Sequence, residues 1–172
     1  TGAVEFVAET YYHSLAALYD KDEYKAQIDM QLELIKKEFG QTPRVFRNTE
    51  LIYNDEIGQY MADLVFEAMI CEGADDVLDW LSPNFVYKVA GREMRIMTKN
   101  YKLSVEIAFR FSIQAWAEYP LTADKVAGWV HGHSGAGDVI NLFMDYETFG
   151  EHQWKETGIF EFLEHLPELL FT

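Results

Sequence analysis

The chain has 172 residues, enough for one domain with a real core, and its 49% hydrophobic and 15% aromatic content excludes a disordered polypeptide. Its 29 acidic and 14 basic residues give a net charge of −15, which argues against a nucleic-acid or anionic-membrane partner because phosphate groups would be repelled. The single cysteine, Cys71, excludes an intrachain disulfide and a cysteine-based zinc site.

No apolar stretch is long enough to span a membrane, and no signal peptide is visible. The lone cysteine fits a reducing compartment, so we expect a cytoplasmic location. Because the chain begins with Thr1 rather than Met, we also expect that the true N-terminus is missing.

Short apolar runs alternate with helical patterns along the first half of the chain. The runs that predict strands are residues 3–8, 44–47 and 66–71. Asp20, with Glu23 three residues later, predicts the start of a helix that ends at Gly40. Asn54 predicts the cap of a second, shorter helix, and a third is expected near residues 75–80.

The alternation continues through the second half. Residues 93–98 predict a fourth strand, and Ser104 and Thr122 each predict the start of a helix. Residues 138–144 (DVINLFM) predict a fifth strand, and residues 157–166 a closing helix. Alternating strands and helices are typical of an α/β fold with parallel strands and helical crossovers. In such folds, ligand sites lie at the carboxyl ends of the strands.

Carboxylates follow the predicted strands at these ends. Glu9 and Glu50 follow the first two strands, while Glu72 and Asp145 directly end the third and fifth. A pair of acids suits retaining glycosyl transfer, in which one attacks the anomeric carbon and the other protonates the leaving oxygen, about 5–5.5 Å away. Strand-end acids also cap helices, so the pattern alone leaves a structural role open for each residue.

Aromatic and histidine side chains lie close to these acids in the sequence. The rings that can offer a face to a sugar are Tyr12, Trp80, Tyr146, Phe149 and Trp154. His131 and His133 lack a third ligand, so we expect a solvated loop and no metal site. We expect Cys71 to be a buried, inert thiol.

Seven segments of the chain resemble the α-amylase branch of glycoside hydrolase family 57. They are GAVEFVAETYYHSL, VFRNTELIYNDEIG, EAMICEGAD, LSPNFVY, AFRFS, YPLTADKVAGW and FMDYETFGEHQW. The resemblance implies a retaining enzyme that acts on α-glucans, with an incomplete (β/α)7 barrel of which this chain covers about five strand-helix units. It further implies that residues 1–172 are one catalytic-domain segment without the first barrel strand and the C-terminal helical region.

The resemblance also implies roles for individual residues. Glu72 matches the family's nucleophile and Asp145 its acid/base. The residues expected to bind substrate are Glu5, His13, Trp80, Tyr146, Phe149 and His152. In the segment LSVEIAFRFS, Val105 stands where relatives tend to have an acid, and Glu106 keeps the second acid of that pair.

The sequence therefore predicts a retaining hydrolase of α-1,4-glucans that needs no cofactor. Two alternatives stay open: a 4-α-glucanotransferase, and a homologue or fragment that binds glucan without turning it over. A metal-dependent deacetylase on a similar barrel would need an Asp and His ligand set that the sequence does not offer. The open edges of an incomplete barrel make self-association a further expectation.

Overall fold

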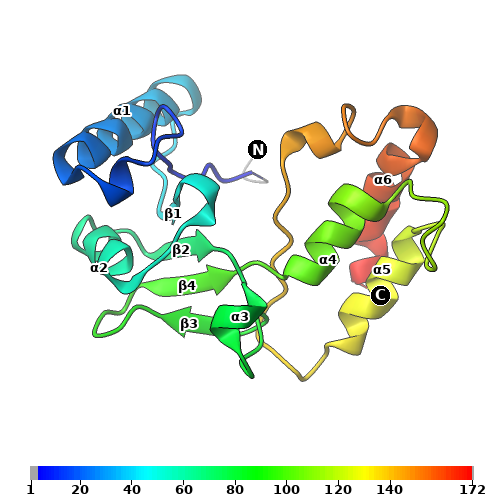
Figure 1. The fold of residues 1–172 in the computed structure, drawn as a ribbon. Coiled ribbons are helices and arrows are strands. Elements are labelled where there is room, and N and C mark those ends of the chain that lie inside the picture. Colours follow the sequence, from blue (N-terminus) through cyan, green and yellow to red (C-terminus); the bar gives the residue numbers. More distant parts are fainter. Residues whose placement is uncertain (1–3, 172) are drawn as a thin grey trace. The chain divides into compact units, whose positions relative to one another are not determined.

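The structure is a computed structural model that describes residues 4–171. The chain divides into two compact units (Figure 1). Unit 1 is the described part of Thr1–Glu72 together with Val86–Thr98. Unit 2 is Gly73–Phe85 together with the described part of Lys99–Thr172.

Two helices of unit 1 begin and end where the sequence predicts. After the short turn η1 (Ala16–Leu18), α1 (Lys21–Phe39) begins at Asp20, whose side chain accepts hydrogen bonds from two N–H groups of the first turn. It ends at Gly40, whose φ of 68° is a left-handed conformation that suits glycine. The helix α2 (Asp55–Asp63) begins at Asn54, whose side chain also accepts a bond from the first turn.

The described residues of unit 1 form a four-stranded sheet in the order β1-β2-β4-β3. The parallel strands are β1 (Val45–Arg47), β2 (Ala68–Cys71) and β4 (Arg95–Thr98), while β3 (Val86–Lys88) is antiparallel to β4 (Figure 1). The strands predicted at residues 44–47, 66–71 and 93–98 are thus confirmed. The sequence did not reveal β3, because this edge strand leaves Val86 and Lys88 exposed and so shows no apolar run.

The strand predicted at residues 3–8 is reduced, in its described part, to one parallel bridge between Ala8 and Phe46. Ala3 lies outside the described residues. The parallel register aligns Phe46 with Met69 and Met69 with Ile96. These three side chains are nearly inaccessible to solvent and form the sheet's contribution to the core.

The core of unit 1 is completed by its two longer helices. Tyr24 and Ile28 of α1 and Ile57 and Met61 of α2 pack into the same cluster as the sheet. Removing such apolar side chains from water is the main stabilising contribution to a fold of this size.

Unit 2 is mainly helical. It contains α3 (Asp75–Leu78), α4 (Tyr101–Val105), the π-helical turn η3 (Glu106–Arg110), α5 (Ala123–Gly132), the turns η4 (Tyr146–Thr148) and η5 (Lys155–Thr157), and α6 (Ile159–Leu170). Helices α5 and α6 lie side by side (yellow and red in Figure 1), and their apolar faces form the core of this unit. The helices predicted near residues 75–80, after Thr122 and at 157–166 are confirmed.

Two predictions in unit 2 are wrong. Residues 138–144 form no strand; their backbone bonds instead to the Asn84 carbonyl, the Asn100 N–H and the Ser104 hydroxyl. The helix expected to begin at Ser104 begins at Tyr101, because the side chain of Asn100 caps it. Ser104 is buried inside α4, where its hydroxyl accepts the Phe143 N–H.

The fold is therefore α/β with a sheet in which parallel pairing predominates, and β1, α2 and β2 form the predicted parallel crossover. The incomplete (β/α)7 barrel stays a prediction. Within residues 4–171, no helix combines the length and apolar character that a membrane crossing requires.

Candidate active site

The carboxyl ends of the parallel strands in unit 1 meet at one edge of the sheet. The register aligns Arg47 with Ile70 and Cys71 with Thr98, so the residues that follow β1, β2 and β4 emerge together. Glu72 is the first residue after β2, is half-buried, and donates its N–H to the Leu51 carbonyl at 3.3 Å. A ligand site in a parallel sheet is expected at this edge.

Two side-chain pairs lie at the same edge. The Arg47 guanidinium is 2.8 Å from the Glu9 carboxylate, and these side chains are only 29% and 31% exposed. The imidazole Nε2 of His13 is 2.8 Å from Oε1 of Glu50, in a more open position. The hydrogen bond from His13 lowers the pKa of Glu50, so that this carboxylate is ionised at neutral pH.

The backbone around these pairs is strained. His13, Glu50 and Leu51 have φ values of 52°, 54° and 58°, a left-handed conformation that costs a residue with a side chain about 1–3 kcal/mol. A buried hydrogen bond of 2.9 Å between the hydroxyls of Thr10 and Thr49 joins the two strained segments. Strain of this kind persists where surrounding contacts fix the conformation, and it is found disproportionately at functional sites.

Glu5 lies at the opposite end of the strands. Its carboxylate is 3.6 Å from Nε of Arg44, which directly precedes β1, and Arg44 also contacts Glu67, which directly precedes β2. The structure therefore places His13 and Glu72 around the turn at Glu50–Leu51 and places Glu5 at the amino edge of the sheet.

Cys71 is buried next to Glu72. Burial, together with the negative charge of Glu72, raises the pKa of the thiol to about 12. Cys71 is therefore a neutral thiol at physiological pH, as the sequence predicts, and does not act as a nucleophile.

The second predicted carboxylate, Asp145, begins a loop of unit 2. Its carbonyl accepts a hydrogen bond from the Thr148 N–H, which closes the turn η4, while its side chain is exposed. The buried side-chain amide of Gln153 donates to the carbonyl of Ala108 in η3 at 3.2 Å. With the bond from Phe143 to Ser104, this fixes both ends of the loop to the α4–η3 segment.

Other residues that the sequence singles out are distributed over unit 2. Tyr146, Phe149 and His152 share the loop with Asp145: the Tyr146 ring is 93% exposed, Phe149 packs on the core, and His152 is exposed. Trp80 lies on a separate segment after α3, and its indole is 85% exposed. The structure thus brings three of these four residues onto one loop with Asp145.

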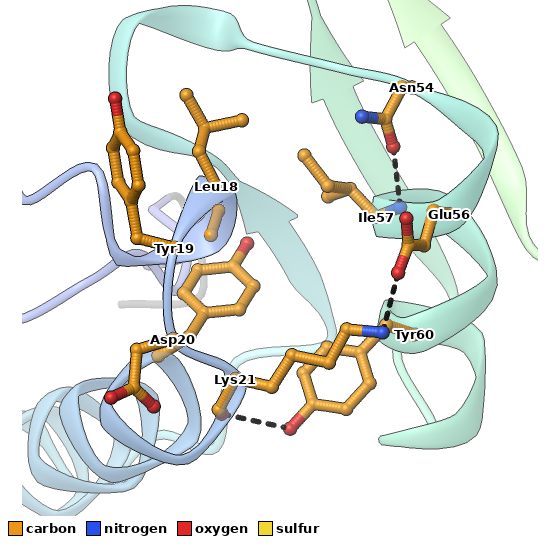
Figure 2. Close-up of a pocket in the computed structure, with 10 residues that line it drawn as sticks. Leu18, Tyr19, Asp20, Lys21, Asn54, Glu56, Ile57 and Tyr60 are labelled. Carbon is orange, nitrogen blue, oxygen red and sulfur yellow. Dashed lines mark hydrogen bonds and ion pairs between the residues drawn. The ribbon is translucent and has the colours of Figure 1, made fainter.

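A small pocket of about 200 Å³ lies in unit 1 between the start of α1 and α2 (Figure 2). Figure 2 shows Lys21 extended toward Glu56, with the ammonium 2.5 Å from the carboxylate, and the Tyr60 hydroxyl bonded to the Lys21 carbonyl. Because its charged groups bond to each other, we assign this pocket a structural role.

Sequence reasoning missed a larger cavity in unit 2, lined by Glu106, Trp116 and Trp129. The signal for it was weak: Glu106 and Arg110 are spaced as an i,i+4 pair, which usually lies on an exposed helix face. Among residues 4–171, no cluster of three or more His, Cys, Asp or Glu side chains is arranged to hold a metal ion.

Comparison with known proteins gives three findings. A protein of Methanocaldococcus jannaschii named "Putative alpha-amylase" is 53% identical over 168 residues, which cover 97% of this chain but 35% of the relative. The crystal structure of 4-alpha-glucanotransferase from Thermococcus litoralis aligns with a TM-score of 0.72 and 20% identity, over 94% of this chain and 26% of that one, and so shares the fold. The model of the family described as glycosyl hydrolase family 57 matches residues 1–171. The chain belongs to glycosyl hydrolase family 57, as its sequence motifs predict.

Proposed function

We propose that this chain carries the two catalytic carboxylates of a retaining hydrolase of α-1,4-glucans, with Glu72 as nucleophile and Asp145 as acid/base. The observation that carries the proposal is the position of Glu72 in a member of this family. It directly follows β2, an inner strand of the sheet, at the edge where parallel sheets place their ligands.

The reaction proceeds in two displacements. Asp145 donates its proton to the glycosidic oxygen while Glu72 attacks the anomeric carbon, so the bond to the leaving sugar breaks and a glycosyl ester forms. Asp145, now ionised, then takes a proton from water, which attacks the same carbon and releases Glu72. The two inversions retain the anomeric configuration, and the mechanism requires carboxyl groups about 5–5.5 Å apart.

The surroundings of Glu72 support the role of nucleophile. Its backbone is fixed by the bond to Leu51, and its neighbour Cys71 is neutral, so no competing thiolate is present. The imidazole of His13 and the guanidinium of Arg47 supply N–H donors for sugar hydroxyls at the same edge.

In unit 2, the ring of Tyr146 on the Asp145 loop and the ring of Trp80 on a separate segment are both exposed and suit stacking on the apolar faces of glucose units. Phe149 and His152 complete the loop as substrate contacts. The role of Glu5, the completion of a (β/α)7 barrel, a cytoplasmic location and self-association remain predictions from the sequence.

A 4-α-glucanotransferase would share every step up to the glycosyl ester. In the second displacement the hydroxyl of an acceptor sugar would replace water, so the products separate the two activities. Hydrolysis of maltoheptaose gives shorter oligosaccharides alone, whereas transfer also gives longer ones.

The test is to incubate the protein with maltoheptaose and to resolve the products by chromatography. Glu72→Gln and Asp145→Asn should each lower turnover about a thousandfold or more, with little change in the melting temperature, because each amide keeps the shape of the acid. Two matched controls also replace a carboxylate by an amide. Glu67→Gln lies at the other end of β2 from Glu72, and Glu151→Gln lies on the loop of Asp145; both should keep wild-type turnover.

The assay is run on this chain and on a chimaera in which the chain replaces the matching segment of the Methanocaldococcus relative. Wild-type turnover in either catalytic variant would overturn the assignment of that residue.

A further inference from the structure

A cavity of about 660 Å³ lies within unit 2. Its walls come from the loop at residues 82–84, from α4 with Glu106, from Trp116, and from α5. None of the residues that line it is among those proposed above to carry the reaction. Its volume falls within the range of about 300–1,000 Å³ that is typical of small-molecule sites.

Glu106 is an unusual component of this wall. The residue is only 7% exposed, and its Oε1 is 3.3 Å from the Arg110 guanidinium. Its Oε2 is buried and has no hydrogen-bond partner among residues 4–171. An unpaired buried carboxylate oxygen is destabilising, so an additional donor that reaches the Glu106 carboxylate would stabilise it. Glu106 also opens the π-helical turn η3, a geometry that is frequent at functional sites.

Two tryptophans form the apolar part of the cavity. The rings of Trp116 and Trp129 meet at 67° with centroids 6.3 Å apart, and both pack on the core of unit 2 while lining the cavity. The Arg110 guanidinium lies 5.9 Å from the centre of the Trp116 ring, which helps to fix that ring. Two half-buried indoles at an angle suit a compact ligand with an apolar face.

The part of the lining that contains Asn84 and Asn100 is polar and preformed. The side-chain amide of Asn100 donates to that of Asn84 at 2.9 Å, and both residues are buried. The Asn84 carbonyl accepts the N–H groups of Asp138 and Val139, which fixes this wall to the following loop. A ligand in this cavity therefore meets aromatic faces as well as fixed amide and carboxylate groups.

We propose that this cavity binds one or two α-linked glucosyl units of a glucan, as a binding site additional to the catalytic carboxylates. A glucose ring presents an apolar face of C–H groups to the indoles and hydroxyl groups to the Glu106 carboxylate and to the amides. A neutral ligand also suits a chain whose net charge is −15. The choice of an α-glucan rests on the proposed function, whereas the choice of a sugar rests on the chemistry of the cavity.

The test uses the four tryptophans of the chain as reporters. The protein is labelled with 15N-tryptophan, and each indole N–H signal is assigned by substitution of Trp80, Trp116, Trp129 or Trp154 with Phe. Titration with maltotriose should shift the signals of Trp116 and Trp129 in a saturable manner.

Two variants of one glycine locate the binding. An added Cβ at Gly128 in α5 meets no described atom within 4 Å beyond its chain neighbours and its own helix backbone, and the residue lines the cavity. Gly128→Leu should fill the space and raise the dissociation constant about tenfold or more, while Gly128→Ala, the matched control, should bind nearly as the wild type does. Glu106→Gln should weaken binding by a similar factor because it alters the acceptor.

The outcomes separate this proposal from the catalytic one. Shifts confined to Trp80 and Trp154 would overturn the cavity proposal and leave the catalytic one standing. Unchanged affinity of Gly128→Leu for maltotriose would also overturn the cavity proposal. Equal shifts with cellotriose would overturn it as well, because they would refute the choice of an α-glucan. Shifts of Trp116 and Trp129 without any turnover of maltoheptaose would support the cavity and count against the catalytic proposal.

Discussion

Among the described glycines, Gly73, directly after Glu72, is the one at which an added methyl group should do most damage. A Cβ built there would lie 2.0 Å from the backbone oxygen of Lys99 and 3.2 Å from Cβ of Pro83. The first distance is 1.0 Å shorter than the 3.0 Å below which Cβ contacts essentially never occur. In Gly73→Ala, either the backbone after β2 or the Lys99 carbonyl must therefore move by about an ångström.

The magnitude follows from this displacement. Overpacking of this kind lowers the free energy of unfolding by about 1–3 kcal/mol. Because a misplacement of about 1 Å in a catalytic group can cost about a hundredfold in rate, kcat/KM on maltoheptaose should also fall about a hundredfold if Glu72 is the nucleophile.

The control is Gly128→Ala, which adds the same methyl group in helix α5 and meets no described atom within 4 Å beyond its chain neighbours and its own helix backbone. It should raise the free energy of unfolding by about 0.5–1 kcal/mol, because alanine favours the helix more than glycine does. Urea denaturation and steady-state kinetics measure the two effects. Wild-type stability and turnover in Gly73→Ala would refute the reasoning from close approach.

Three further changes test the local structure of unit 1. Val65→Gly should raise the free energy of unfolding, measured in urea, by about 1 kcal/mol, because Val65 is 86% exposed and has a left-handed φ of 67°. A lower free energy of unfolding would contradict the strain assigned to Val65. Asp20→Ala should lower it by about 1 kcal/mol, because two N–H groups of α1 lose their acceptor, and an unchanged urea midpoint would argue against the cap. Cys71 has a folded pKa of about 12 against an ordinary value of 9.0, so above pH 9 the unfolded thiol ionises while the folded one does not. The wild type should therefore lose about 1.4 kcal/mol by pH 10 relative to Cys71→Ser, and parallel stability curves for the two proteins would refute this.

The predictions that proved right rest on local signals. Asp20 and Asn54 cap their helices because a short acceptor side chain before an amphipathic run satisfies the free N–H groups of the first turn. The three parallel strands were visible as apolar runs because inner positions such as Phe46 and Met69 are fully buried.

The wrong predictions depend on distant contacts. Residues 138–144 are as apolar as a strand, but their backbone bonds to loop and helix groups of unit 2. Ser104 resembles a helix cap, yet its hydroxyl serves Phe143, 39 residues away. Local sequence cannot specify a partner at that distance.

In the candidate site, too, the sequence predicts local features but not those that depend on distant contacts. The position of Glu72 at a strand end followed from the apolar run before it. The ion pair of Arg47 with Glu9 and the strained turn at Glu50–Leu51 did not, because each depends on segments that are far apart in the sequence. The sequence singles out Glu106 as an acid but not its burial, because its spacing from Arg110 is that of an exposed helical pair.

The most direct test of the central claim is to trap the glycosyl ester. Asp145→Asn is incubated with maltosyl fluoride, whose leaving group needs no acid, so the first displacement proceeds while the second is slowed. The protein is then digested and its peptides are analysed by mass spectrometry. If Glu72 is the nucleophile, a maltosyl adduct is expected on the peptide that contains Glu72, and specifically on Glu72. An adduct on another carboxylate, or release of product with inverted configuration and no adduct, would contradict it.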